Sequence, residues 1–391
     1  MHLPPPVDPL KIVIDENIPF GKEAFGALAE VVSLPGRAIE PKVVRDAEVL
    51  VVRSVTNVDA ALLQHSAVQF VGTATAGCNH IDRDYLEKNH ILFASAEGAN
   101  ANSVAEYVVA ALLMRARETE TPLRGLSLGI IGVGHIGARV AEKAAALGMD
   151  ILLNDPPLRR KTGLACYRSF REACEADFIT LHVPLILEGP DATRHLFDEA
   201  AIAALSPETV VINTSRGEVV DNAAFLRAVI RERLPAPIFD VWENEPAINW
   251  AFLRQAGIFT PHIAGYSLDG KIAGTRQIYE TLCAALGVPP TWTPRASALP
   301  AAPLIQLDAA NRDDLDILSD LTAQAYDLRG DVRRFEAVLS LPFEARPKAF
   351  DQLRKTYPPR REFQSAQLTV CHAAPPLLSQ ISGLGFKPPR V

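Results

Sequence analysis

Three residues whose types suit acid–base chemistry, Arg216, Glu245 and His262, each follow a short apolar stretch of the sequence. The guanidinium group of an arginine can bind a carboxylate through two parallel hydrogen bonds. A histidine can accept a proton near neutral pH, and a neighbouring carboxylate stabilises its charged form. The set is therefore suited to taking a proton from a hydroxyl group beside a carboxylate, with His262 as the base and Glu245 supporting it.

Each of these residues also has a plainer interpretation when it is considered alone. An arginine before a glycine often caps a helix, a histidine after a proline is often packed, and a glutamate before a proline often belongs to a turn. Their succession at three predicted strand ends, downstream of a glycine motif, favours the catalytic interpretation.

That glycine motif has the spacing G-x-G-x-x-G, with Gly132, Gly134 and Gly137 between a predicted strand, 128–131, and a predicted helix, 135–147. In a dinucleotide-binding fold the first glycine allows a tight turn, the second lets the backbone approach a pyrophosphate, and the third lets helix and strand pack closely. The helix N-terminus also favours phosphate. We therefore predict a dinucleotide site that includes the intervening residues His135 and Ile136. The alternative is a tight turn without a ligand.

An acidic residue, Asp155, ends the next predicted strand, 151–154, and stands 18 positions after Gly137. A carboxylate there can accept the ribose hydroxyls of NAD and repels the additional phosphate of NADP. The sequence therefore predicts NAD as the cofactor.

Strands that alternate with helices position these residues and predict an α/β fold with doubly wound parallel sheets. Ligands bind beyond the carboxyl ends of such strands, where Arg53, Ser54 and Thr75 make a plausible polar pocket. The predicted strands before the glycine motif are 11–15, 49–52 and 70–72, and those after residue 155 are 178–181, 210–213, 238–241 and 258–260.

A long helix is expected to open at Asn102 and to connect two domains, with Ser103 and Glu106 forming a capping box. A proline-rich linker from about Pro289 precedes a small α+β domain with strands near 304–307 and 367–371. Its helices are expected over 313–328, 332–339 and 377–384.

Composition excludes several classes of protein. The chain of 391 residues is 48% hydrophobic, and its net charge of −7 without a long basic run makes a nucleic-acid partner unexpected. It has no apolar signal core and no apolar run of membrane-spanning length, so no membrane association is expected. Its five scattered cysteines predict reduced thiols in the cytoplasm, and its nine histidines form no metal-ligand cluster.

Four segments of the chain together resemble the signatures of D-isomer-specific 2-hydroxyacid dehydrogenases. They begin at Gly132 (GVGHIG), Asn213 (NTSRG), Asp240 (DVWENEP) and Pro261 (PHIAG). The resemblance implies an Arg/Glu/His catalytic set, a Rossmann-type NAD-binding domain over 103–262, and a discontinuous flavodoxin-like substrate-binding domain over 1–102 and 263–290. Residues 291–391 would form a C-terminal dimerisation domain.

Further segments are similar to the branch of that family that oxidises a phosphorylated four-carbon 2-hydroxy acid during pyridoxal phosphate biosynthesis. They are IDENIP from Ile14, VRSVT from Val52, ATAG from Ala74, HIAGYS from His262 and FDQLRKTYPPRREF from Phe350. By this resemblance the cofactor site also includes Thr214, Ser215, Asp240 and Gly265, and the substrate contacts Ser54, Thr75 and Tyr266. The sequence departs from the pattern at His135, where asparagine is expected, and at Val183, where threonine is usual.

The resemblance implies a homodimer formed through the C-terminal domain and a small phosphorylated substrate. Arg53, Arg360 and Arg361 are the candidates for binding the phosphate, although the arginine doublet could equally be a solvated charge pair. Two alternatives remain open: a dehydrogenase of another phosphorylated acid such as 3-phosphoglycerate, and an NAD-sensing corepressor that needs no turnover.

Overall fold

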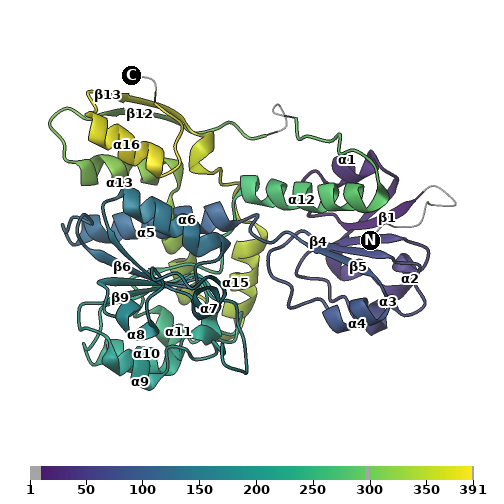
Figure 1. Cartoon of the computed structure of the whole chain (residues 1–391), viewed down its shortest axis with the longest axis horizontal. Coiled ribbons are helices and arrows are strands. Elements are labelled where there is room, and N and C mark those ends of the chain that lie inside the picture. The colour runs from purple at the N-terminus through teal and green to yellow at the C-terminus, as the bar shows by residue number, and fades with distance from the viewer. Residues whose placement is uncertain (1–9, 296–298, 390–391) are drawn as a thin grey trace. The chain divides into compact units, whose positions relative to one another are not determined.

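The computed structural model describes residues 10–295 and 299–389. The chain forms two compact units (Figure 1). The first unit comprises residues 1–100 and 267–301, and the second comprises residues 101–266 and 302–391. The C-terminal segment, expected from the sequence to be a separate domain, thus packs with the nucleotide-binding part of the chain.

The first unit is built on a five-stranded parallel sheet with the order β2-β1-β3-β4-β5. This order is that of flavodoxin-like folds, as expected. Its strands are β1 (Lys11–Asp15), β2 (Glu30–Leu34), β3 (Val49–Val52), β4 (Phe70–Thr73) and β5 (Leu92–Ser95). Its helices are α1 (Gly21–Gly26), α2 (Pro41–Val44), α3 (Ala60–Leu63), α4 (Arg83–Lys88) and α12 (Leu268–Leu286).

Both faces of this sheet are covered, because successive side chains of a strand point to opposite faces. Ile12 and Ile14 contribute to the core under α1 and α12, whereas Val13 contributes to the core on the other face. The two edge strands, β2 and β5, were not predicted. Their residues are mostly half-buried, so they lack the continuous apolar runs that identify the central strands.

The second unit contains a six-stranded parallel sheet with the order β11-β10-β9-β8-β6-β7. Its strands are β6 (Ser127–Ile131), β7 (Asp150–Asn154), β8 (Phe178–Leu181), β9 (Val210–Asn213), β10 (Ile238–Phe239) and β11 (Ile258–Phe259). A single parallel bridge between Leu153 and Tyr167 extends the sheet beyond β7. With this bridge, the order is that of the doubly wound dinucleotide-binding fold.

The helices of this part are α5 (Ala101–Glu118), α6 (His135–Ala146), α7 (Pro156–Thr162), α8 (Phe170–Ala173), α9 (Glu199–Ala204), α10 (Asn222–Ile230) and α11 (Trp250–Leu253). The expected capping box at Ser103 and Glu106 was wrong, because α5 already begins at Ala101. Both side chains instead bond to the C-terminal segment: Ser103 donates to Glu362, and Glu106 accepts from the backbone N–H of Phe363. A contact between residues this far apart in sequence cannot be distinguished from a local cap by spacing alone.

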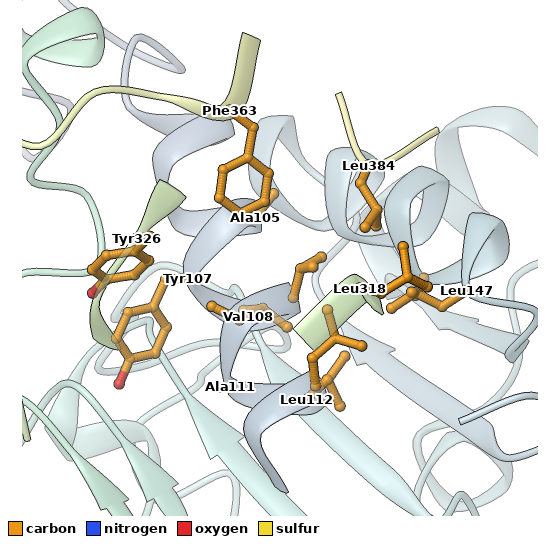
Figure 2. Close-up of a cluster of buried hydrophobic side chains, with 14 of the residues drawn as sticks. Ala105, Tyr107, Val108, Ala111, Leu112, Leu147, Leu318, Tyr326, Phe363 and Leu384 are labelled. Atoms are coloured by element: carbon orange, nitrogen blue, oxygen red, sulfur yellow. The ribbon is translucent and has the colours of Figure 1, made fainter. Parts of the chain in front are cut away.

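The C-terminal segment contains a two-stranded parallel sheet of β12 (Leu304–Asp308) and β13 (Gln367–Cys371), with helices α13 (Asp314–Ala325), α14 (Leu328–Glu336), α15 (Arg346–Lys355) and α16 (Pro375–Gly383). Side chains from this segment, including Leu318, Tyr326 and Phe363, lie against Tyr107 and Val108 of α5 in one buried cluster (Figure 2). This cluster explains why the segment does not form a unit of its own. Helix α15 was not predicted from the sequence.

Burial of charge accompanies this packing. Glu106 is buried, and desolvation together with the nearby Glu362 raises its pKa to about 8. Lys143 of α6 is also buried and donates to the carbonyl oxygen of Leu384 at 2.6 Å. The core between α5, α6 and the C-terminal segment is therefore a mixed apolar and polar one.

Among the residues that the structure describes, no helix is long and apolar enough to cross a membrane. All five cysteines are free thiols.

Candidate active site

The three motif glycines lie where β6 meets α6, and each meets a different steric demand. Gly132 has a φ of 90°, a left-handed conformation that glycine adopts without strain. A Cβ atom on Gly137 would lie 2.1 Å from the carbonyl oxygen of Gly132, so only glycine allows the helix to pack there. A Cβ atom on Gly134 would meet nothing within 4 Å, so this position is open on the side where a pyrophosphate would approach.

Substituting Gly134 with alanine should therefore weaken cofactor binding without destabilising the fold. We expect the NAD dissociation constant to rise roughly ten- to hundredfold, the cost of displacing a hydrogen bond to a charged group, and stability to change by less than about 0.5 kcal/mol. Titration calorimetry and thermal unfolding measure the two quantities. Gly26→Ala, at another position with open space, is the matched control. Unchanged NAD affinity in the Gly134 variant would contradict this use of the loop.

Asp155 follows β7 and is half-buried beside the glycine loop. Its Oδ2 accepts a hydrogen bond from the backbone N–H of Val133 at 2.9 Å, and its Oδ1 accepts one from Leu158 at the start of α7, also at 2.9 Å. The carboxylate thus holds the loop and caps a helix. Because each carboxylate oxygen has a further lone pair, both can still accept from ribose hydroxyl groups.

Arg216, Glu245 and His262 follow the neighbouring strands β9, β10 and β11, whose carboxyl ends share one edge of the sheet. His262 Nδ1 lies 2.7 Å from Glu245 Oε2, and Glu245 Oε1 accepts from the backbone N–H of Trp242 at 2.9 Å. Burial disfavours the charged form of Glu245, but His262 and the backbone hydrogen bond outweigh it and hold the pKa of this carboxyl below its usual value. Glu245 is therefore an ionised partner that can orient the imidazole.

The backbone of His262 adopts a left-handed conformation with a φ of 57°, which costs free energy in any residue with a side chain. Buried Asp240 offsets this cost. Its carbonyl oxygen accepts from the N–H of His262 at 2.7 Å, and its carboxylate accepts from Ile263 at 2.8 Å and Ala264 at 2.9 Å. Asp240 was predicted to line the cofactor site, and the structure shows that its carboxylate is already engaged in shaping the His262 loop.

A second layer of hydrogen bonds surrounds Asp240. Thr260 donates to Asp240 Oδ1 at 2.6 Å, the hydroxyl group of Tyr107 lies 2.8 Å from that of Thr260, and the indole N–H of Trp242 donates to the carbonyl oxygen of Thr260 at 3.0 Å. Sequence reasoning missed Tyr107 and Thr260, because their role depends on a contact between α5 and β11 that no local pattern indicates.

Arg216 is half-buried, and its Nη1 donates to the carbonyl oxygen of Ser215 at 2.7 Å. Asn213 fixes this loop by accepting from the N–H and hydroxyl groups of Ser215 and donating to the carbonyl oxygen of Arg216. A Cβ atom on Gly217 would lie 1.9 Å from the carbonyl carbon of Trp242, so the loop after β9 packs directly on the loop that leads to Glu245.

Thr214, a predicted cofactor residue, lies 3.2 Å from Nδ1 of His182 at the end of β8. The hydroxyl group of Thr180 lies 3.0 Å from Nε2 of the same ring. Burial lowers the pKa of His182 to about 3, so this histidine is neutral at physiological pH. The neutral ring of His182 thus helps to fix the position of Thr214. Val183, the next residue, offers no side-chain hydrogen bond to a cofactor.

The remaining cofactor and substrate candidates of the second unit lie just beyond His262. Gly265 and Tyr266 are half-buried. The ring of Tyr266 meets that of Tyr357 edge to face at 5.9 Å between centroids, and the guanidinium carbon of Arg354 lies 5.9 Å from the Tyr266 ring centroid.

In the first unit, Arg53 and Ser54 follow β3, and Thr75 follows β4, so all three lie at the same edge of that sheet. Thr75 donates to the carbonyl oxygen of Gly77 at 3.1 Å and lies 2.8 Å from the hydroxyl group of Thr73. Thr73 is in turn 3.0 Å from Nε2 of His80, whose pKa burial lowers. Arg53 is half-buried and Ser54 is exposed.

The two arginines of the C-terminal doublet have different surroundings. Arg360 is buried, donates to the carbonyl oxygens of Ser103 at 2.9 Å and Ala264 at 3.1 Å, and stacks on the ring of Tyr326 at 4.1 Å. Both of these hydrogen bonds come from Nη2, and its Nε and Nη1 atoms are buried without a hydrogen-bond partner among the described residues. Arg361 is half-buried.

The fold and the site geometry are those of a dinucleotide-dependent dehydrogenase, and comparison with known proteins agrees. Residues 99–264 match the family described as "D-isomer specific 2-hydroxyacid dehydrogenase, NAD binding domain", and residues 298–385 match a domain of unknown function, DUF3410. Among solved structures, the D-lactate dehydrogenase of Aquifex aeolicus complexed with NAD and lactic acid is 26% identical with a TM-score of 0.55 and covers 71% of this chain and 95% of that one.

Curated relatives match over almost the whole chain. The erythronate-4-phosphate dehydrogenase of Chromohalobacter salexigens is 41% identical over 97% of this chain and 98% of its own length, and that of Azotobacter vinelandii is 42% identical over 97% and 100%. The chain therefore belongs to the erythronate-4-phosphate dehydrogenase family, within the D-isomer-specific 2-hydroxyacid dehydrogenases. It is an NAD-dependent oxidoreductase, as predicted from the glycine motif, Asp155 and the Arg216, Glu245 and His262 set.

Proposed function

We propose that this chain oxidises C2 of 4-phospho-D-erythronate with NAD, giving 2-oxo-3-hydroxy-4-phosphobutanoate, a step of pyridoxal phosphate biosynthesis. The observation that carries the proposal is the ionised Glu245 held 2.7 Å from His262 at the strand edge that also presents Arg216. Relatives that share 41% and 42% identity with the chain over nearly their whole lengths support this choice of substrate.

In the proposed reaction, each residue of the set has one task. Arg216 binds the substrate carboxylate and the oxygen on C2, and His262 accepts the proton of the C2 hydroxyl group as the hydride leaves. Glu245 keeps the imidazole oriented through Nδ1 and stabilises its charged form. The bound NAD supplies the hydride acceptor, and the glycine loop, Asp155, Thr214 and Ser215 are the residues that would hold it.

Formation of NADH from a panel of 2-hydroxy acids tests the proposal. We expect 4-phospho-D-erythronate to give the highest kcat/KM, well above that of 3-phosphoglycerate or the unphosphorylated acid. A preference for 3-phosphoglycerate would favour the first alternative. Binding of NADH without turnover of any acid would favour a corepressor, against which the Arg216, Glu245 and His262 set argues.

The Asp155 carboxylate should make the enzyme prefer NAD to NADP by at least about tenfold in kcat/KM. A carboxylate and a phosphate about 4 Å apart repel each other by roughly 1–4 kcal/mol. Arg160 is paired with Asp191 at 2.5 Å, so it should not attract the additional phosphate of NADP. The neighbouring Arg159 could attract that phosphate and so reduce the preference for NAD. Steady-state kinetics with both cofactors, for the wild type and for Arg159→Ala, measure the ratio. Equal values for the two cofactors would refute the role of Asp155.

A cation must bind the substrate phosphate, because an unpaired dianion in a closed site is costly. Arg53→Ala and Arg361→Ala should each lower kcat/KM for the phosphorylated acid roughly ten- to hundredfold if the residue makes that contact, corresponding to 1.5–3 kcal/mol. The unphosphorylated acid should be unaffected by either substitution. Arg360→Ala, in contrast, should reduce turnover of both acids equally, because Arg360 holds backbone carbonyl groups.

The exposed Arg45 supplies the control for these variants, since Arg45→Ala removes a surface arginine of the first unit. Kinetics with both acids and the oligomeric state of each variant decide the outcome. Equal losses of kcat/KM on the two acids for the Arg53 and Arg361 variants would show that neither arginine binds the phosphate.

The proposal also includes a cytoplasmic homodimer formed through the C-terminal segment. Exposed Leu304 and Phe343 in that segment, with 68% and 64% of their surfaces accessible, and the free cysteine thiols support it. Light scattering of the purified protein gives the mass in solution.

A further inference from the structure

His182 lies at the end of β8, between two strands whose loops are assigned to the cofactor. In the sheet, β8 is flanked by β6, which leads to the glycine loop, and by β9, which leads to Thr214. The backbone N–H of His182 donates to the carbonyl oxygen of Ile131 at 2.8 Å, and a Cβ atom on Gly132 would lie 2.9 Å from the carbonyl carbon of His182. The backbone of His182 therefore packs directly against the first glycine of the motif.

The side chain of His182 contacts two threonine hydroxyl groups through its two ring nitrogens. Nδ1 lies 3.2 Å from the hydroxyl oxygen of Thr214, which follows β9, and Nε2 lies 3.0 Å from that of Thr180 in β8. Both threonines are buried, and desolvation of the ring keeps it neutral at physiological pH. A neutral imidazole has one N–H and one bare nitrogen, so the ring donates to one hydroxyl group and accepts from the other.

This contact gives the Thr214 hydroxyl group a fixed direction and leaves part of its hydrogen-bonding capacity unused. A hydroxyl group has one donor and two acceptor sites, and the contact with His182 occupies one of them. The two strands are already held together by their backbones, since Leu181 pairs with Asn213 in register. What the ring adds is the orientation of a hydroxyl group at the carboxyl edge of the sheet, where a dinucleotide binds.

We propose that His182 is a positioning residue for NAD, which fixes the Thr214 hydroxyl group for a hydrogen bond to the cofactor. The inference rests on the assignment of Thr214 to the cofactor in the proposed function. A hydroxyl group that is already held in its bound direction loses less freedom on binding than one that rotates, so the ring should raise the affinity for NAD. Because the effect concerns NAD binding alone, it is independent of which acid the enzyme oxidises.

Two substitutions of His182 separate the roles of the two ring nitrogens. The amide group of asparagine lies as many bonds from Cβ as Nδ1 does, and that of glutamine as many as Nε2. His182→Gln should therefore keep a partner for Thr180 and lose the one for Thr214. We expect titration calorimetry to give an NAD dissociation constant roughly three- to tenfold above the wild-type value for this variant, the contribution of one hydrogen bond. His182→Asn keeps a partner for Thr214 and should recover most of this loss.

Thr214→Val, which removes the hydroxyl group and keeps the shape of the side chain, is the second half of the test. It should raise the NAD dissociation constant at least as much as His182→Gln does. Adding His182→Gln to it should cause no further rise, because the histidine acts through that hydroxyl group. His372→Gln is the control, since His372 pairs with Asp308 on the exposed surface of the C-terminal segment and should leave NAD affinity unchanged.

The proposal is overturned if His182→Gln leaves the NAD dissociation constant unchanged, raises it no more than His182→Asn does, or adds its effect to that of Thr214→Val. A general disturbance of β8 would not distinguish the two ring nitrogens. Thermal unfolding shows whether each variant is folded. If the His182 variants are not, Thr214→Val decides alone, since unchanged NAD affinity overturns the proposal and a rise of the expected size supports it. A wild type that binds NAD but oxidises none of the acids would contradict the proposed function and not this inference.

Discussion

Replacing His262 with asparagine is expected to reduce kcat by roughly 10²–10⁴, the usual contribution of general acid–base catalysis. Asparagine also tolerates the left-handed backbone conformation of this position better than most residues, so the fold should persist. Stopped-flow and steady-state measurements of NADH formation give the rate, and NADH binding should be retained.

His195→Asn is the matched control, because the chain contains a second histidine–glutamate pair at the same distance, although it is formed through the other ring nitrogen. His195 Nε2 lies 2.7 Å from Glu243 Oε1, and the φ of His195 is also positive, at 48°. This pair has no proposed part in the reaction, so its variant should retain near wild-type kcat. Comparable losses in the two variants would argue that structural disturbance, and not loss of the base, explains the effect.

Glu245→Gln should move the acidic limb of kcat/KM to lower pH. A carboxylate beside an imidazole favours its protonated form, so removing the negative charge makes the base lose its proton at lower pH. An unchanged profile would mean that Glu245 is only a turn residue.

Phe335→Ala should lower the free energy of unfolding by about 3–5 kcal/mol, a large part of the 5–15 kcal/mol typical of a folded protein. Phe335 of α14 is fully buried, and its ring lies 5.5–6.3 Å from four other aromatic rings, those of Trp242, Trp250, Phe259 and Phe350. The substitution would leave a cavity between the C-terminal segment and the strands that carry Glu245 and His262.

Leu187→Ala is the control, because Leu187 belongs to the same unit but is 64% exposed. It should cost less than about 1 kcal/mol. Urea unfolding followed by fluorescence and by circular dichroism measures both variants. A loss below 1 kcal/mol for Phe335→Ala would show that the segment contributes little to the stability of the second unit.

The parts of the fold that the sequence predicted are those fixed by local patterns. The central strands, such as Val49–Val52 and Val210–Asn213, are fully buried on both faces and therefore read as short continuous apolar runs. The edge strands of the first sheet, β2 and β5, and helix α15 carry mixed side chains and gave no such signal. Ser103 and Glu106 fitted a local cap by spacing, but they bond to Glu362 and to the backbone of Phe363, more than 250 residues away.

In the candidate site, too, the residues that follow local patterns were predictable and those that depend on tertiary contacts were not. Arg216, Glu245 and His262 were predictable because each follows a recognisable strand, and parallel strands bring their carboxyl ends to one edge. The use of Asp240 to hold the His262 loop was not predictable, since it depends on which backbone N–H groups the tertiary fold turns toward it. The approach of Arg354 to the ring of Tyr266 likewise follows from a long-range packing arrangement that spacing does not encode.

The contacts between α5, α6 and the C-terminal segment also constrain how the protein can be made on the ribosome. Glu106 accepts from the N–H of Phe363, 257 residues later, and Lys143 donates to Leu384, 241 residues later. While the chain is still growing, the face of α5 that packs on the C-terminal segment is uncovered, and Glu106 and Lys143 lack these two partners, although the glycine loop and its strands have already emerged. The last contacts of this core can therefore form only after residue 384 has been synthesised, and until then one apolar face of α5 stays exposed to water.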